Sequence, residues 1–315
     1  MTIQQLQYIV AIDEHRHFGR AAEACFVTQP TLSSMVKKLE EELDVVLFDR
    51  SRSPVVSTAD GEMIVQQARA VLKEVEVLRT MADSTRQDQN GDLRIGMIPT
   101  LAPYLLPLFL GGLLERYPGI RLSVEELTTA EIIDRLVHGR LDVGLLATPL
   151  GVAGLREEPL FNERFLLYVS PQEGIGRKQY VLPSEINADR LWLLEEGHCL
   201  RSQVLDLCQL RERGAAGGRF AYVSGSIEAL MRMVDAQGGL TVVPELATVG
   251  MPLAREAGVR AFKAPVPVRE ISLVSYRHSV KGQLLQMLKD AVQTAVRPHL
   301  KRTTDPLVVP VDVVV

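Results

Sequence analysis

The sequence predicts an α plus α/β protein: a small helical domain, one long helix, and then a two-part α/β domain. Helical spacing of apolar residues fills the first 58 residues, and a narrower apolar stripe continues to about residue 86. From residue 93 onward, strand-like and helix-like segments alternate. The 315 residues are 46% hydrophobic, which is enough to bury the cores of two or three domains.

Residues 1–58 are expected to form three short helices and a small β wing, the elements of a winged helix-turn-helix. Small and apolar residues recur where the second and third helices would cross. Thr28 is a suitable N-cap for the third helix, and Pro30 is tolerated in its first turn. Glycine is common at the turn before it, but Phe26 stands there, so we expect a different backbone geometry. Strand-like residues at 45–56 predict the wing.

Residues 59–90 are expected to form a linker helix and a hinge. Apolar residues along the helix alternate in steps of four and three, at Ile64, Ala68, Val71, Val75, Leu78 and Ala82. A stripe this narrow favours pairing with another chain, so we expect dimerisation. The polar run at 84–91 has no apolar anchor and is expected to be the hinge.

Residues 91–302 are expected to form an α/β domain of two subdomains with a cleft between them and largely parallel strands. The first would comprise 91–161 and 269–302, and the second 162–268. The expected strands are 93–98, 120–126, 141–147, 165–170, 191–194, 220–223, 240–243 and 270–276. The expected helices are 101–117, 129–138, 199–211, 226–236 and 280–296. The tail, 303–315, is rich in β-forming residues, but the sequence assigns it no role.

Charge and targeting signals restrict the class of protein. The net charge of −4 carries no nucleic-acid signature, so a motif has to decide whether the chain binds DNA. Neither an apolar run of about 20 residues nor a signal-peptide pattern occurs, so we expect a cytoplasmic protein without a membrane partner. His15 and His17 lack further ligands at metal spacing, and the paired glycines lack nucleotide-binding patterns. No metal or cofactor is expected.

The three cysteines fall into two classes. In a reducing compartment a disulfide would be regulatory or catalytic rather than structural. Cys25 lies on an apolar helical face and is expected to pack there. Cys199 stands at a strand-to-helix junction between His198 and Arg201, where helix amides and nearby cations would favour a thiolate. We therefore expect a lowered pKa for Cys199.

Cys208 follows Cys199 by nine residues. If this stretch is helical, the two Cα atoms are about 13 Å apart at about 1.5 Å per residue. A disulfide tolerates at most about 7 Å, so forming one would unwind the helix and change the shape of the domain. From spacing alone, two unrelated cysteines on one helix remain an open alternative.

The segment FGRAAEACFVTQPTLSSMVKKLEEELDVVLFDR resembles the signature of the LysR-type regulators, and the likeness extends from Met1 to about residue 300. It implies a winged helix-turn-helix, a linker helix and a periplasmic-binding-protein-like effector domain, with double-stranded promoter DNA as partner. The recognition helix would begin at Thr28. The residues implied to contact DNA are Thr28, Gln29, Pro30, Thr31, Ser33 and Lys37, with Arg50 and Arg52 on the wing.

Within that family, EHRHFGRAAEAC, IGMIPTLAPYLLP and LLEEGHCLRSQVLDLC resemble the peroxide-sensing OxyR group. The resemblance implies Cys199 as the peroxidatic thiol, assisted by His198 and Arg201, and Cys208 as the resolving thiol. It also implies that Thr100 and Thr129 help to hold hydrogen peroxide.

The same resemblance implies a homotetramer built as a dimer of dimers. Dimers would form through the linker helix and tetramers through the regulatory domains. RNA polymerase and a cellular dithiol reductant are the further expected partners.

Two alternatives to peroxide sensing stay open on the sequence. One is a LysR-type regulator that binds a small organic effector between its subdomains and has no redox switch. The other is a thiol peroxidase in which Cys199 turns over catalytically. The helix-turn-helix argues against an enzyme, and the resemblance implies a regulator that activates oxidative-stress genes.

Overall fold

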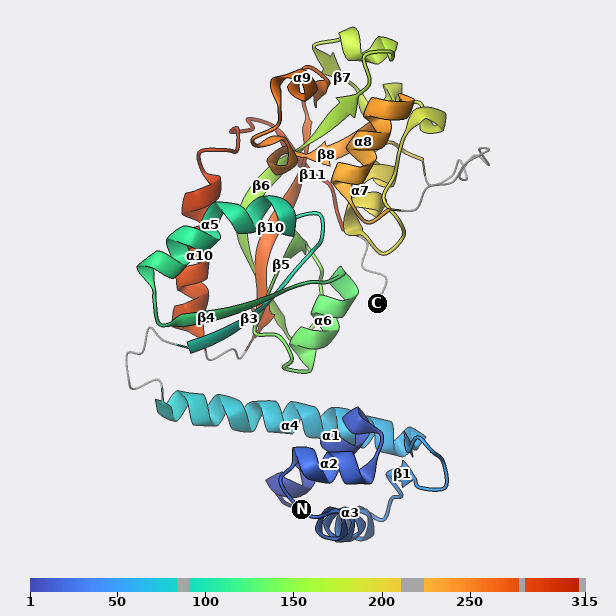
Figure 1. Ribbon diagram of the computed structural model, residues 1–315, viewed down its shortest axis with the longest axis vertical. Coiled ribbons are helices and arrows are strands. Elements are labelled where there is room, and N and C mark those ends of the chain that lie inside the picture. The colour runs from blue at the N-terminus through green and yellow to red at the C-terminus, as the bar shows by residue number, and fades with distance from the viewer. Residues whose placement is uncertain (84–90, 211–223, 278–280, 312–315) are drawn as a thin grey trace. The chain divides into compact units, whose positions relative to one another are not determined.

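The computed structural model describes residues 1–83, 91–210, 224–277 and 281–311 (Figure 1). The chain divides into two compact units, Met1–Gln87 and Asp88–Val315. The first unit is a helical domain with a small wing, and the second is a mixed α/β domain. The predicted fold class is therefore confirmed. The expected hinge lies outside the described residues up to residue 90, and Gly91 already begins a strand.

The first unit packs three helices beneath a short antiparallel hairpin. Its elements are α1 (Ile3–His15), α2 (Phe18–Ala24), α3 (Gln29–Leu43), β1 (Phe48–Asp49) and β2 (Val56–Ser57). The Thr28 hydroxyl accepts a hydrogen bond from the backbone of Thr31, so Thr28 caps α3 as expected. Phe26 adopts a φ of 57°, a left-handed conformation, and its side chain is 96% exposed. The turn therefore has the left-handed geometry that glycine favours, and the expectation of a different backbone geometry is wrong.

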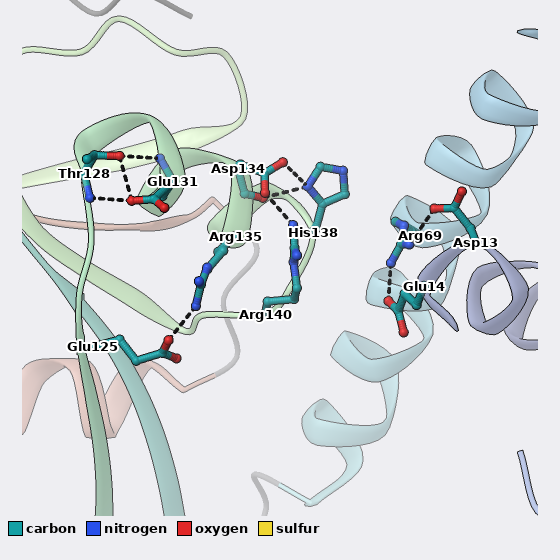
Figure 2. A network of polar contacts seen from close by, with 10 residues as sticks. All are labelled: Asp13, Glu14, Arg69, Glu125, Thr128, Glu131, Asp134, Arg135, His138 and Arg140. Carbon is teal, nitrogen blue, oxygen red and sulfur yellow. Dashed lines mark hydrogen bonds and ion pairs between the residues drawn. The ribbon is translucent and has the colours of Figure 1, made fainter. Parts of the chain in front are cut away.

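The linker helix α4 spans Ala59–Asp83. Its residues Val65 and Ala68 are buried in the core formed by α1 to α3, and Arg69 forms ion pairs with Asp13 and Glu14 of α1 (Figure 2). The first half of the apolar stripe thus packs within its own unit, because α1 lies against it. Further along α4, Leu78 is 70% exposed. A second chain could therefore pair with the apolar stripe only beyond the first turns of α4.

The second unit contains a nine-stranded sheet, in the order β4-β3-β5-β10-β6-β9-β7, with β11 added to β10 and β8 to β6. The strands are β3 (Gly91–Met97), β4 (Ile120–Glu126), β5 (Val143–Thr148), β6 (Leu155–Val169), β7 (Tyr180–Val181), β8 (Leu240–Pro244), β9 (Val259–Phe262), β10 (Val266–Tyr276) and β11 (Pro306–Val308). β3 pairs in parallel with β4 and β5. Largely parallel pairing was expected throughout, and for the sheet taken together this is wrong. The long strands β6 and β10 are antiparallel to each other, β6 is antiparallel to β8, and β10 is antiparallel to β5.

Helices cover this sheet and divide the core in two. They are α5 (Ala102–Arg116), α6 (Thr129–Val137), α7 (Cys199–Leu207), α8 (Ile227–Gln237), α9 (Leu253–Glu256) and α10 (Gly282–Val296), with 3-10 turns at Gly174–Arg177, Pro183–Glu185, Ala188–Arg190 and Glu245–Thr248. α5 and α10 pack together over the first core, while α7 and α8 belong to the second (Figure 1). β6 contributes to both cores, and β10, whose core residues belong to the first, pairs with β6 along most of its length.

Two expected elements differ from the structure, and a third cannot be compared with it. The strand at 191–194 is reduced to one isolated bridge between Leu191 and Leu240, because a 3-10 turn ends immediately before it. The strand at 220–223 lies outside the described residues. The helix expected to reach residue 211 ends at Leu207.

Candidate functional site

Cys199 is the first residue of α7 and lies half-buried at the edge of the first core. Its Sγ atom is 2.6 Å from Oγ1 of Thr129, the first residue of α6. A capping box fixes the start of α6, because Thr128 donates backbone and hydroxyl hydrogen bonds to Glu131 (Figure 2). Two helix starts from different subdomains therefore meet at this thiol.

A buried arginine, Arg269, lies close enough to Cys199 for its charge to act on the thiol. Arg269 of β10 is 1% exposed, and its guanidinium donates to Glu163 Oε2 at 2.8 Å and to Thr100 Oγ1 at 3.0 Å. The other carboxylate oxygen of Glu163 accepts the backbone N–H of Leu246. Thr100 is thus connected to the Cys199 site by its hydrogen bond to Arg269. Sequence reasoning missed Arg269 and Glu163, because each has a charged neighbour on its own strand and nothing in the sequence marks either as buried.

The expectation of a lowered pKa is wrong in its net direction. Burial raises the pKa of the Cys199 thiol, while the Thr129 hydroxyl, the backbone amide of Cys199 and the charge of Arg269 act to lower it. The two side chains expected to assist the thiol have other partners. Arg201 donates to the Leu194 carbonyl at 2.6 Å, and His198 Nε2 lies 3.4 Å from Glu195 Oε1.

Cys208 lies at the opposite end of α7, where it is the C-cap, and is buried in the second core. Burial alone raises its pKa to about 12. Both cysteines are free thiols. The helix that the prediction assumed between them is confirmed. Nine helical steps of about 1.5 Å correspond to a Cα separation of about 13 Å, beyond the about 7 Å that a disulfide allows.

Gln203 is a third residue that sequence reasoning missed. It lies one helical turn beyond Cys199 on α7 and is fully buried. Its Nε2 donates to the Val309 carbonyl at 2.8 Å. Its Oε1 has no hydrogen-bond partner among the described residues. Its spacing from Leu200 and Val204, on the apolar face of the helix, was the available signal.

The residues predicted to contact DNA lie at the start of α3, further along α3 and on the wing. Those exposed at the start of α3 and further along it are Thr28, Gln29, Pro30, Thr31 and Lys37, while Ser33 is half-buried. On the wing, Arg52 is exposed and pairs with Asp49 at 3.1 Å. Arg50 instead folds back, because it forms an ion pair with Glu40, donates to Ser33 and lies over the Phe18 ring.

Cys25, in contrast, packs against the core of the first unit, as expected, and burial raises its pKa. Across the described ranges no cluster of three metal-ligating side chains occurs. Nor does any described helix have the length and apolar character needed to cross a membrane.

Two family models match the sequence and together cover most of it. "Bacterial regulatory helix-turn-helix protein, lysR family" matches residues 3–62, and "LysR substrate binding domain" matches residues 86–297. The hydrogen peroxide-inducible genes activator of Haemophilus influenzae is 36% identical over 98% of this chain and all of its own length. This chain belongs to the OxyR group of the LysR family. OxyR of Escherichia coli K12, named a DNA-binding transcriptional dual regulator, is also 36% identical, over 96% of the chain and 98% of its own length.

Solved OxyR structures share the fold. A full-length OxyR variant from Pseudomonas aeruginosa is 35% identical and superposes with a TM-score of 0.76, over 94% of this chain and 98% of its own. A cysteine-to-serine OxyR variant from Corynebacterium glutamicum with bound hydrogen peroxide is 28% identical, with a TM-score of 0.62 over 96% of this chain and 98% of its own. The LysR-type architecture therefore holds over the whole chain.

Proposed function

We propose that this OxyR-type chain is a cytoplasmic, hydrogen peroxide-sensing transcription regulator and not an enzyme. The observation that carries the proposal is the position of Cys199. Its thiol contacts Thr129 beside the buried pair of Arg269 and Thr100, and the helix that it begins ends at Cys208. Reversible formation of a Cys199–Cys208 disulfide would be the switch that activates oxidative-stress genes.

The chemistry needs two steps. The Cys199 thiolate attacks one peroxide oxygen, the O–O bond breaks, and the departing oxygen takes up a proton and leaves as water. The Cys208 thiol then attacks the sulfenic sulfur of Cys199, releasing a second water and forming the S–S bond. Two thiols thereby give two electrons to one peroxide. A cellular dithiol would return both cysteines to the reduced state.

The site residues have distinct roles in this scheme. The Arg269 guanidinium stabilises the thiolate and the charge that develops on the departing oxygen. The hydroxyls of Thr129 and Thr100 orient peroxide near Sγ. His198 and Arg201, directed away from the thiol, fix the loop before α7 and its first turn through Glu195 and Leu194.

Disulfide formation would reach DNA through a change of domain shape. Promoter DNA would be bound by α3 and the wing, by dimers formed through α4 and tetramers formed through the regulatory units. The oxidised form would reposition the paired DNA-binding domains and recruit RNA polymerase.

The test compares peroxide-dependent transcription of the wild type, Cys199→Ser and Cys208→Ser chains, together with the thiol state by mass spectrometry. Loss of the response in both variants, with a Cys199–Cys208 link in the wild type that dithiol reverses, supports the proposal. A retained response in Cys199→Ser would favour the alternative, a regulator switched by a small organic effector. The match to a LysR substrate binding domain is the observation behind that alternative.

A further inference from the structure

The C-terminal segment from Asp305 to Val311 is fixed beside the redox helix. β11 extends the sheet by pairing in parallel with β10. Before β11, the backbone N–H of Val266 donates to the Asp305 carbonyl, and after it the N–H of Val309 donates to the Val268 carbonyl, both at 2.9 Å. Backbone pairing on both sides of β11 therefore sets the register of the segment.

Two valines of this segment insert into the two cores. Val309 is 4% exposed and belongs to the second core, which includes Leu200, Val204 and Cys208 of α7. Val311 is 9% exposed and belongs to the first core, at whose edge Cys199 packs. The segment therefore packs into both cores, and α7 contacts both cores as well.

A direct hydrogen bond joins the segment to the middle of α7. The Gln203 side chain donates to the Val309 carbonyl at 2.8 Å, and both groups are buried. A buried carbonyl oxygen that loses its hydrogen-bond donor is destabilising, because the lost bond is not replaced by one to water. This bond therefore opposes any movement of Gln203 away from Val309. Beside it is a hollow of about 450 Å³ lined by Cys208, Gln209 and residues 307–310. Unwound turns of α7 have space to move there.

We propose that residues 305–311 are a latch that holds α7 in its reduced fold and opens when the disulfide forms. The proposal rests on the proposed function, because it concerns the same Cys199–Cys208 step. Joining the ends of α7 requires the helix to unwind around Gln203, which breaks the bond to Val309. The latch therefore slows the attack of the Cys208 thiol on the Cys199 sulfenic acid, with loss of water. It leaves the preceding reaction of Cys199 with peroxide unchanged.

The test uses the full chain in three forms: Val309→Ala, truncation after Thr304, and the control Leu307→Ser. Leu307 lies on the same segment but is 48% exposed. Hydrogen exchange of the α7 amides is measured in the reduced chain, and disulfide closure is timed by quenched mass spectrometry after peroxide. If the latch opens by local unfolding, the truncation should accelerate both by about tenfold and Val309→Ala by about threefold. Leu307→Ser should stay at the wild-type values.

Each remaining outcome has a defined meaning. In a Cys208→Ser background, sulfenic acid formation on Cys199 should proceed at the same rate in all forms. A change there as large as the change in closure would overturn the latch and place the segment in the peroxide site. Unchanged α7 exchange in both variants, with native circular dichroism, would also overturn it. Absence of any peroxide-induced disulfide in the wild type would refute the proposed function, and the exchange measurement would still decide the latch.

Discussion

Cys199 is a thiol on which burial and specific contacts act in opposite directions. Burial raises its pKa, and the Thr129 hydroxyl, its own amide and the Arg269 charge lower it. The thiolate is the nucleophile, so these contacts set how much of the reactive form exists near neutral pH. Because the net shift is upward, only a minor fraction is thiolate there, and the rate should rise about tenfold per pH unit below the pKa.

Replacing Thr129 by Val removes the hydrogen bond to Cys199 Sγ while keeping the size of the side chain. The pKa of Cys199 should then rise further, so its reaction with an alkylating agent should need a higher pH, and oxidation by peroxide at pH 7 should slow by about tenfold. Thr129→Ser keeps the hydroxyl and serves as the control. An alkylation profile of Thr129→Val that coincides with that of the wild type would show that this contact does not tune the thiol.

Arg269 carries a positive charge that acts to lower the pKa of Cys199, and Glu163 pairs with it. Arg269→Met alone should destabilise the second unit by about 3–5 kcal/mol, because it leaves a buried carboxylate unpaired. The double variant Arg269→Met with Glu163→Gln should recover much of that stability but not the reactivity. Urea unfolding measures the stability and stopped-flow peroxide oxidation the reactivity. Full recovery of the oxidation rate in the double variant would exclude Arg269 from the reaction.

Among the elements, the wing carries two arginines that were predicted to contact DNA and that differ in their contacts within the protein. Arg52 is exposed, so Arg52→Ala should weaken binding similarly on all sequences and reduce the slope of log K against log salt by about 0.9. Arg50 also braces Glu40 and Ser33, so Arg50→Ala should lower the melting temperature as well. Fluorescence anisotropy across salt concentrations and thermal melting separate these effects. An unchanged salt slope in Arg52→Ala would show that this arginine contacts no phosphate.

Local sequence patterns predicted most helices and strands, but they did not predict contacts between residues far apart in the sequence. The helix-turn-helix was predictable because its cap, Thr28, and its turn lie within a few residues of each other. The end of α7 was misplaced because the left-handed residue after its cap, Gln209, has no sequence signal of its own. The pairing of Arg269 with Glu163 joins residues 106 positions apart and follows from strand topology, which apolar periodicity does not encode.

At the scale of the molecule, the proposed redox site and the residues predicted to contact DNA belong to different units. The residues assigned to the redox site all lie within Asp88–Val315, and α3 and the wing lie within Met1–Gln87. A thiol's reactivity depends on contacts within a few ångströms, so it should not depend on the other unit. The two activities are therefore expected to be separable.

A fragment comprising residues 88–315 should accordingly form the Cys199–Cys208 disulfide at a rate within about twofold of the full chain, since every group that shifts the Cys199 pKa is present in it. The same fragment should not bind promoter DNA. Quenched mass spectrometry gives the rate, anisotropy gives the binding, and circular dichroism checks that the fragment is folded. A folded fragment that oxidised about tenfold more slowly would mean that the first unit shapes the thiol site, and the redox reaction would then belong to the whole chain.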